Sequence, residues 1–215
     1  MNGPELVALL DRTLALLGGR TDELRDLDAA VGDGDLGITV AKGCEAVRAR
    51  LAGLADPTPA GVLKAAGAAA ANANPSTMAA LVGGGLMGAG KVLGDAASIG
   101  PAEAAAIARV FADSIASRGK SAVGDKTILD AIVPSIEALE AAADRLTAPE
   151  ILDAMIAAAR EGVETTTPLQ NQRGRAAWLG ARSAGHPDPG ATAYLRFLES
   201  LAAAWTTPGN QPIGA

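Results

Sequence analysis

The sequence predicts an all-α protein, and three observations support this fold class. Hydrophobic residues make up 49% of the 215 residues but aromatic residues only 2%, and Ala, the strongest helix former, supplies much of the apolar content. Apolar residues recur at helical spacing, and glycine or proline marks the ends of the periodic stretches. The first stripe consists of Leu6, Leu9, Leu10, Leu14 and Leu17. We therefore expect one domain over 1–215, built as a helical barrel or bundle.

Each expected helix has a recognisable beginning or end. Gly18-Gly19 ends the first helix, Thr58-Pro59 caps and opens another, and Pro101 begins a third. Thr147, with Glu150 three residues later, forms a capping box. The expected helices are 4–17, 21–28, 38–54, 59–71, 77–93, 101–119, 126–143, 147–164 and 191–204, with a short helix between the loop at 165–175 and the turn at 186–190. The tail at 207–215 is expected to be a flexible, frayed end.

Charge and cysteine content restrict the classes of partner and compartment. The formal net charge is −6 and the isoelectric point about 4.8, which disfavours nucleic-acid binding because phosphate backbones require a basic surface. Cys44 is the single cysteine and cannot form an intrachain disulfide, which fits a reducing compartment. No uninterrupted apolar run is long enough to cross a bilayer. We expect a cytoplasmic protein that binds neither nucleic acid nor membrane.

The most informative segment is the acidic turn at residues 27–37, Leu-Asp-Ala-Ala-Val-Gly-Asp-Gly-Asp-Leu-Gly. Asp and Gly disfavour helix interiors, so a tight turn between helices is expected here. It brings together the carboxylates of Asp28, Asp33 and Asp35 with no basic residue between them. Close carboxylates repel one another, and a hard divalent cation such as Mg²⁺ or Ca²⁺ relieves the conflict. The alternative is a helix junction with solvated aspartates. An EF-hand is excluded, because its twelfth position would be Cys44.

A glycine-rich segment formally matches two nucleotide-binding motifs. Residues 83–88 fit the pattern of a dinucleotide fingerprint, and residues 85–91 nearly fit a P-loop. Both motifs require a preceding strand, and the residues upstream are rich in Ala and Asn. Val92 also replaces the hydroxyl residue of a P-loop. We interpret the segment as a helix whose small residues permit close helix–helix approach.

Four segments in order carry a family likeness. They are 27–37, 117–130 (with Ser-Arg-Gly-Lys and Gly-Asp-Lys-Thr-Ile-Leu-Asp), 174–183 (Gly-Arg-Ala-Ala-Trp-Leu-Gly-Ala-Arg-Ser) and 185–192 (Gly-His-Pro-Asp-Pro-Gly-Ala-Thr). Together they resemble the nucleotide-binding L subunit of dihydroxyacetone kinase, which also occurs as the C-terminal domain of single-chain dihydroxyacetone kinases. The likeness extends over essentially the whole chain.

The resemblance implies an eight-helix antiparallel, up-and-down barrel that binds ADP or ATP through two Mg²⁺ ions. Asp28, Asp33 and Asp35 match the family's metal ligands. Such a cluster would supply the charge neutralisation that phosphoryl transfer needs. The expected nucleotide-binding residues are Leu36, Gly37, Ile38, Thr39, Ser76, Thr77, Met78, Gly119, Ile128, Arg175, Asp188, Pro189 and Gly190. Among these, the resemblance places Gly119 and Ile128 at the adenine and Thr77 and Met78 at a phosphate turn.

Two departures from the family pattern lie within this set. Leu36 stands where many L subunits have His, so a polar contact from that side chain is lost. The phosphate turn at 74–78 reads Asn-Pro-Ser-Thr-Met in place of a Gly-Gly-Ala-Ser-Gly type, although the hydroxyls of Ser76 and Thr77 can still donate. These differences suggest a divergent branch, with dihydroxyacetone first and a four-carbon ketose such as erythrulose second as the acceptor.

Other prominent residues have simpler interpretations. His186 is the only histidine, and we expect a structural or indirect role for it in its turn. Lys126 and Asp130 are spaced as an i,i+4 helix ion pair. Trp178 and Trp205 are expected in the core or at an interface.

The leading functional hypothesis is a kinase half-enzyme that acts with a substrate-binding K-type subunit, and a homodimer is compatible with it. Either ATP exchanges freely, or bound ADP is rephosphorylated by a phosphoenolpyruvate-linked phosphotransfer subunit. Two alternatives stay open at this point. One is a non-catalytic, ADP–Mg-dependent regulatory module, and the other is a kinase domain for a related substrate such as a fatty acid.

Overall fold

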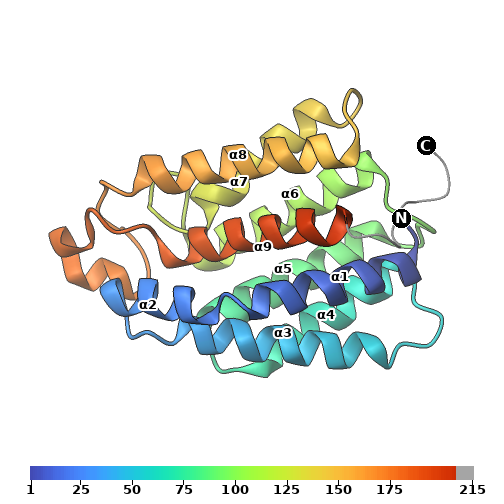
Figure 1. The fold of residues 1–215 in the computed structure, drawn as a ribbon, viewed down its shortest axis with the longest axis horizontal. Coiled ribbons are helices and arrows are strands. Elements are labelled where there is room, and N and C mark those ends of the chain that lie inside the picture. Colours follow the sequence, from blue (N-terminus) through green and yellow to red (C-terminus); the bar gives the residue numbers. More distant parts are fainter. Residues whose placement is uncertain (207–215) are drawn as a thin grey trace.

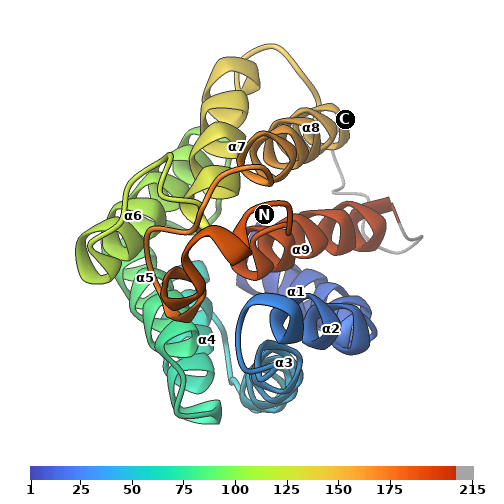
Figure 2. The same ribbon diagram turned by 90° about the vertical axis from the view of Figure 1, so that its left-hand side faces the viewer.

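Eight long helices form a closed ring in the structure, a computed structural model that describes residues 1–206 (Figures 1 and 2). The ring consists of α1 (Gly3–Gly18), α3 (Leu36–Ala52), α4 (Pro59–Ala73), α5 (Thr77–Leu93), α6 (Pro101–Gly119), α7 (Leu129–Ala142), α8 (Ala148–Thr166) and α9 (Pro189–Thr206). Two further helices are α2 (Thr21–Val31) and the 3₁₀ helix η1 (Arg175–Ser183). Each helix from α3 to α9 packs against the next long helix, and α1 closes the ring by packing against both α3 and α9.

The ring confirms the all-α, eight-helix barrel, with two additions within residues 1–206. Helix α2 continues from the end of α1, and η1 crosses one end of the barrel between α8 and α9 (Figure 1). The chain alternates in direction around the ring, so alternate connections meet at the same end. The α2–α3, α4–α5, α6–α7 and α8–η1 connections all lie at the left-hand end in Figure 1. The tail at 207–215 lies outside the described residues.

Local sequence signals account for most helix boundaries. Thr58 Oγ1 accepts a hydrogen bond from Gly61 N at 3.1 Å, as expected of an N-cap. Two expectations are corrected. Helix α2 runs to Val31, so Asp28 lies in its last turn rather than in the loop, and α7 begins at Leu129 rather than at Lys126. Lys126 has a φ of +57°, which a right-handed helix does not allow.

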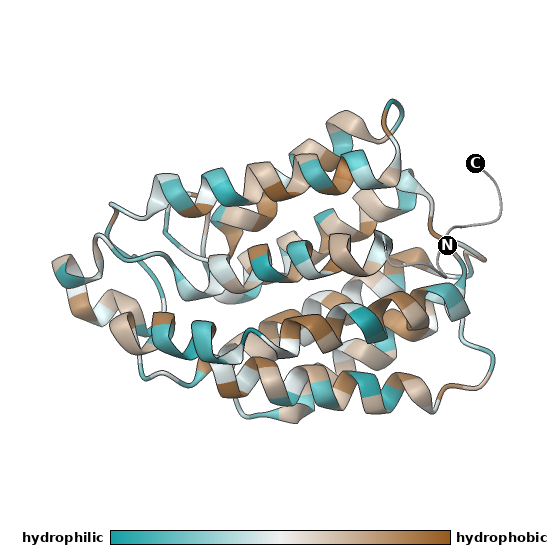
Figure 3. Cartoon of the chain, viewed as in Figure 1, coloured by the Kyte–Doolittle hydropathy of each residue, from teal (hydrophilic) through white to brown (hydrophobic). Residues whose placement is uncertain are grey.

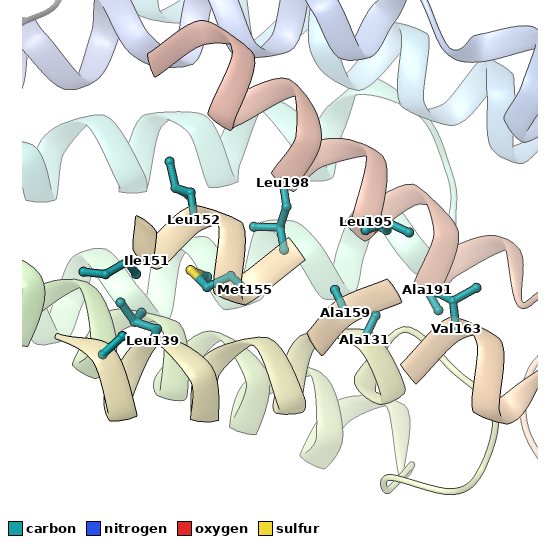
Figure 4. Packing of buried hydrophobic residues seen from close by; sticks show 11 residues of the cluster. Ala131, Leu139, Ile151, Leu152, Met155, Ala159, Val163, Ala191, Leu195 and Leu198 are labelled. Carbon is teal, nitrogen blue, oxygen red and sulfur yellow. The ribbon is translucent and has the colours of Figure 1, made fainter. Parts of the chain in front are cut away.

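Clusters of buried side chains fill the space between the helices. One cluster joins α7, α8 and α9 through residues such as Ile151, Leu195 and Leu198 (Figure 4). A second joins α1, α3, α4 and α5. Hydrophilic residues (teal) recur along the helices between the hydrophobic ones (Figure 3). No helix in residues 1–206 is long and apolar enough to span a membrane.

The glycine-rich segment forms α5 and packs closely on α4. A Cβ at Gly67 would lie 2.6 Å from Gly83 O, and one at Gly83 would lie 2.5 Å from Gly67 O. Neither position can therefore carry a side chain without separating the two helices. The small-residue interpretation is confirmed, and the formal match to nucleotide motifs is explained by packing.

Candidate metal and nucleotide site

The acidic turn brings its three carboxylates together at the end of the barrel where α2 meets α3. One carboxylate oxygen from each of Asp28, Asp33 and Asp35 lies within 4.8 Å of the other two. Two glycines make this possible. Gly34 has a φ of +74°, and a Cβ at Gly32 would lie 2.5 Å from Asp28 Oδ1. The glycines of the sequence pattern therefore shape the turn and leave room for the carboxylate.

Asp28 is half-buried and links the acidic turn to the following helix. Its Oδ2 accepts a hydrogen bond from Leu36 N, the first residue of α3, at 3.1 Å. Burial raises the pKa of Asp28, and the negative charges of Asp33 and Asp35 add to the increase. Behind this contact a Cβ at Gly37 would lie 2.4 Å from Thr21 O, so α3 can approach α2 only with glycine there. Leu36 and Gly37 are buried, and Ile38 is exposed.

Arg175 reaches the acidic turn from η1, far along the chain. Its Nη1 donates to both carboxylate oxygens of Asp33 and to Asp35 Oδ2, the last at 3.1 Å. The hydrogen bonds to Asp35 and Asp33 raise the pKa of Arg175 further above its already high value. The turn thus has a counter-charge that the local sequence does not reveal. None of these hydrogen bonds joins Arg175 to Asp28.

The turn before α5 lies beside the first turn of α3. Asn74 Nδ2 donates to Thr39 Oγ1 at 3.0 Å, and Lys42 Nζ donates to Asn74 Oδ1 at 3.4 Å. Ser76 is the N-cap residue of α5, but its side chain makes no capping hydrogen bond. The first N–H groups of a helix have no partner within the helix and attract anions. The start of α5, with Ser76 and Thr77, therefore offers donors near the acidic turn.

A hydrophobic cluster lies near this end of the barrel, and four of the expected nucleotide contacts belong to it or adjoin it. A Cβ at Gly190 would lie 2.8 Å from Met78 Cε and 3.5 Å from Ile128 Cβ. A Cβ at Gly119 would lie 3.6 Å from Leu81 Cδ1. Met78, Leu81 and Ile128 belong to one hydrophobic cluster. The fold thus brings together residues from α5, the α6–α7 loop and α9 that the sequence resemblance groups around the adenine.

Lys126 and Asp130 do not form the ion pair expected from their spacing. The Lys126 side chain is fully buried, and its Nζ donates to three backbone carbonyls. Asp130 instead accepts from the backbone N–H groups of Gly124 and Thr127, at 2.6 and 2.7 Å. The expectation was wrong because it assumed a helix at Lys126, whereas the chain there is a loop folded inward.

Asp188 is buried at the start of α9 beside Pro189. Its Oδ1 accepts from Ala191 N at 3.0 Å, and its Oδ2 accepts from Asn171 Nδ2 at 3.3 Å. Burial, together with the negative charge of Asp130, raises the pKa of Asp188 to about 6. Asp188 thus anchors the start of α9 through its hydrogen bonds, and Gly190, two residues later, lies against Met78 and Ile128.

The remaining prominent residues divide between exposed and packed positions. His186 is exposed. Trp178 is 86% exposed and so lies outside the core, and its expected place at an interface stays a prediction, whereas Trp205 packs against the core cluster of α7, α8 and α9. The sequence arguments missed Asn171 and the role of Lys126. Gly124 in the Gly-Asp-Lys-Thr pattern indicates a turn at this point, but the pattern does not reveal the distant carbonyls that Lys126 contacts.

The class of domain that the structure describes is a closed barrel of helices with a carboxylate triad and the N-termini of α3, α5, α7 and α9 at one end. Within that class, residues 30–203 match the DAK2 domain family. The chain is 31% identical over 201 residues to the ADP-binding subunit DhaL of the phosphoenolpyruvate-dependent dihydroxyacetone kinase of Escherichia coli, covering 93% of this chain and 96% of that protein. The chain therefore belongs to the DAK2 domain family of dihydroxyacetone-type kinases.

Longer relatives contain the same domain as one part of their chain. The L-erythrulose 1-kinase of Mycolicibacterium smegmatis is 37% identical over 201 residues, which cover 91% of this chain and 34% of that protein. The dihydroxyacetone kinase of C. freundii in complex with AMP-PNP and Mg²⁺ superposes with a TM-score of 0.71 at 25% identity, covering 93% of this chain and 34% of that one. The chain thus spans about a third of these kinases.

Proposed function

We propose that this chain is the nucleotide-binding component of a ketose kinase. It binds ADP or ATP together with Mg²⁺, and it delivers the terminal phosphoryl group to a small ketose held by a substrate-binding partner. The observation that carries the proposal is the carboxylate triad, with oxygens within 4.8 Å, beside the start of α5. Carboxylate oxygens are the protein ligands that Mg²⁺ prefers, and helix N-termini favour phosphate.

The residues at this end of the barrel each have a role in the proposal. Asp28, Asp33 and Asp35 hold two Mg²⁺ ions, which neutralise phosphate charge when bound. Ser76, Thr77 and the first N–H groups of α5 contact the phosphates. Arg175 exchanges its contacts with Asp33 and Asp35 for a phosphate or ribose oxygen when the cations occupy the carboxylates.

The remaining expected residues hold the rest of the nucleotide. The hydrophobic cluster that contains Met78 and Ile128, with Gly190 against it and Gly119 nearby, borders the adenine in this proposal. Leu36 to Thr39 and the segment from Asp188 to Gly190 border the nucleotide from α3 and α9. Leu36 is buried, so its difference from the family's His alters packing under the site rather than an exposed contact.

The similar proteins support a partner and a class of acceptor. DhaL of E. coli is named as a subunit of a phosphoenolpyruvate-dependent kinase, and the M. smegmatis relative is named for erythrulose. We infer a K-type substrate-binding partner and a phosphoenolpyruvate-linked phosphotransfer partner, with dihydroxyacetone or erythrulose as acceptor in the cytoplasm. Positioning and charge neutralisation dominate phosphoryl transfer, so the domain needs the partner to place the ketose hydroxyl and to exclude water.

Calorimetry of the purified chain tests the nucleotide site directly. Mg–ADP is expected to bind, and ADP in EDTA is expected to bind at least about tenfold more weakly, a difference of about 1.4 kcal/mol. A coupled ADP-release assay with dihydroxyacetone and erythrulose, with and without the K-type partner, then tests the kinase. Binding without phosphorylation in any combination would favour the ADP–Mg-dependent regulatory module. Equal affinity with and without metal would contradict the proposed site.

A further inference from the structure

Lys126 heads the largest fully buried side chains of the described residues. Its Nζ donates to Leu169 O at 2.7 Å, to Ser183 O at 2.8 Å and to Thr167 O at 2.9 Å. Three accepting carbonyls match the three N–H donors of an ammonium group, whereas a neutral amine has only two. The ammonium is therefore completely satisfied without a carboxylate partner at hydrogen-bonding distance.

The three carbonyls belong to the two ends of one segment. Thr167 and Leu169 precede the loop that leads to η1, and Ser183 is the last residue of η1. Further bonds join the same two ends, because Asn171 N donates to Ser183 Oγ at 3.0 Å and Gly185 N donates to Thr167 O at 2.9 Å. We call residues 167–185 the η1 segment. Lys126 enters this segment from the α6–α7 loop and ties its ends together.

The other attachments of the η1 segment to the barrel are concentrated at the α6–α7 loop and at α2 with the acidic turn. Gln172 N donates to Asp125 O at 2.9 Å, and Arg173 Nε donates to Asp125 Oδ2 at 3.1 Å. Helix η1 packs on α2, and Arg175 contacts Asp33 and Asp35, whereas Trp178 is 86% exposed. The position of Arg175 over the acidic turn therefore depends on how the two ends of the segment are held. Of the groups that hold them, the ammonium of Lys126 is the one that bonds to both ends at once.

We infer that Lys126 is a positioning residue, which fixes both ends of the η1 segment and thereby places Arg175 at the acidic turn. A residue that served only to fill the core would be apolar, because burying an ammonium group is costly and gains nothing in packing. The backbone carbonyl of Lys126 extends the same link, since it accepts from Asn171 Nδ2 at 2.8 Å. The role of the segment in binding rests on the proposed function, whereas its attachment by Lys126 does not.

Hydrogen exchange of the metal-free chain tests the attachment. Lys126→Met keeps the length of the side chain and removes the three donors, and Lys91→Met, at an exposed lysine of α5, is the matched control. We expect amides of the η1 segment to exchange at least about tenfold faster in Lys126→Met, with α3 and α4 unchanged. Unchanged exchange in the segment, or a uniform increase over all helices, would overturn the inference.

A double-mutant cycle tests whether Lys126 acts through Arg175. Arg175→Gln and Lys126→Met are each expected to weaken Mg–ADP binding. The double variant is expected to have the same affinity as the single variant that binds Mg–ADP less tightly. Additive effects would show that Lys126 does not act through Arg175. If Lys126→Met does not fold, Lys126→Gln, which keeps a polar side chain but removes the charge and shortens the reach to the three carbonyls, replaces it in both experiments with the same expected direction. Absence of Mg–ADP binding by the natural chain would contradict the proposed function and leave the exchange result to decide the attachment.

Discussion

Replacing Asp28 by Asn removes one negative charge from the carboxylate triad and keeps the hydrogen bond that this side chain accepts. Asp28 Oδ2 accepts from Leu36 N, and an amide oxygen can accept the same bond. Arg175 contacts Asp33 and Asp35, so the change at Asp28 leaves those contacts in place. Because burial and the neighbouring carboxylates already raise the pKa of Asp28, the metal-free variant should be at least as stable as the natural chain.

The expected loss of affinity follows from the size of the triad. A divalent cation bound to the three carboxylates lies closer to each than the 4.8 Å within which the oxygens lie. Even at 4.8 Å and the dielectric constant of water, a double charge and a single charge attract by about 1.7 kcal/mol. Removing that attraction should weaken Mg–ADP binding by roughly twentyfold, and by more where solvent is displaced.

Thermal unfolding measures this loss without any assay of activity. A ligand at a hundredfold excess over its Kd stabilises the folded state by about 2.7 kcal/mol, which raises the Tm of a domain this size by about 5–10 °C. For Asp28→Asn the increase should fall to about half of that or less at the same ligand concentration. Asp26→Asn is the control, since Asp26 lies on the same helix and pairs only with Arg25 among the ion pairs. Equal shifts in the two variants would refute the metal assignment.

Three further outcomes are expected. Mg–ADP should raise the Tm and ADP in EDTA should leave it nearly unchanged, whereas equal shifts would mean that Arg175 and backbone donors hold the phosphates alone. With a folded-state pKa of about 6 for Asp188 and an unfolded value near 3.9, the stability that this group contributes at low pH is lost as the pH rises from about 4 to 6. Asp188→Asn should therefore gain about 2 kcal/mol relative to the natural chain as the pH rises from 4.5 to 7 in urea unfolding, and a constant difference would contradict the buried carboxyl. Rapid ketose phosphorylation by the purified chain alone, in an ADP-release assay, would contradict the half-enzyme.

The sequence predicted the fold because helix boundaries are local. The cap at Thr58 and the proline at Pro101 act within a few residues, and both helices begin where these signals place them. The errors occurred where distant parts of the chain decide the conformation. Lys126 is spaced as an exposed helical residue, but three carbonyls from residues 167–183 hold it in the interior. No local pattern contains that information.

The triad was predictable for the same reason, since Asp28, Asp33 and Asp35 lie within one turn of chain and the glycines between them allow it. Its counter-charge was not predictable, because Arg175 follows 140 residues after Asp35. Because Arg175 offsets part of the charge of Asp33 and Asp35, the three carboxylates of the metal-free chain repel one another less than the sequence of the turn alone suggests. The proposal of a bound cation is better supported by Asp28, which receives no hydrogen bond from Arg175 and whose pKa is raised by burial and by the charges of Asp33 and Asp35.

The up-and-down order of the barrel explains why motifs far apart in the sequence meet at one rim. Consecutive long helices run in opposite directions, so every second connection returns to the same end of the barrel (Figure 1). The connections at 32–35, 74–76, 120–128 and 167–188 are those connections, and they contain or adjoin the expected site residues. The connections at 53–58, 94–100 and 143–147 lie at the other end and contain none of them. If the proposed site is correct, the connections at one end of the barrel are constrained by ligand binding, whereas those at the other end affect only the stability of the barrel. Substitutions of equal exposure at the two ends should therefore differ in their effect on Mg–ADP affinity while they agree in their effect on Tm.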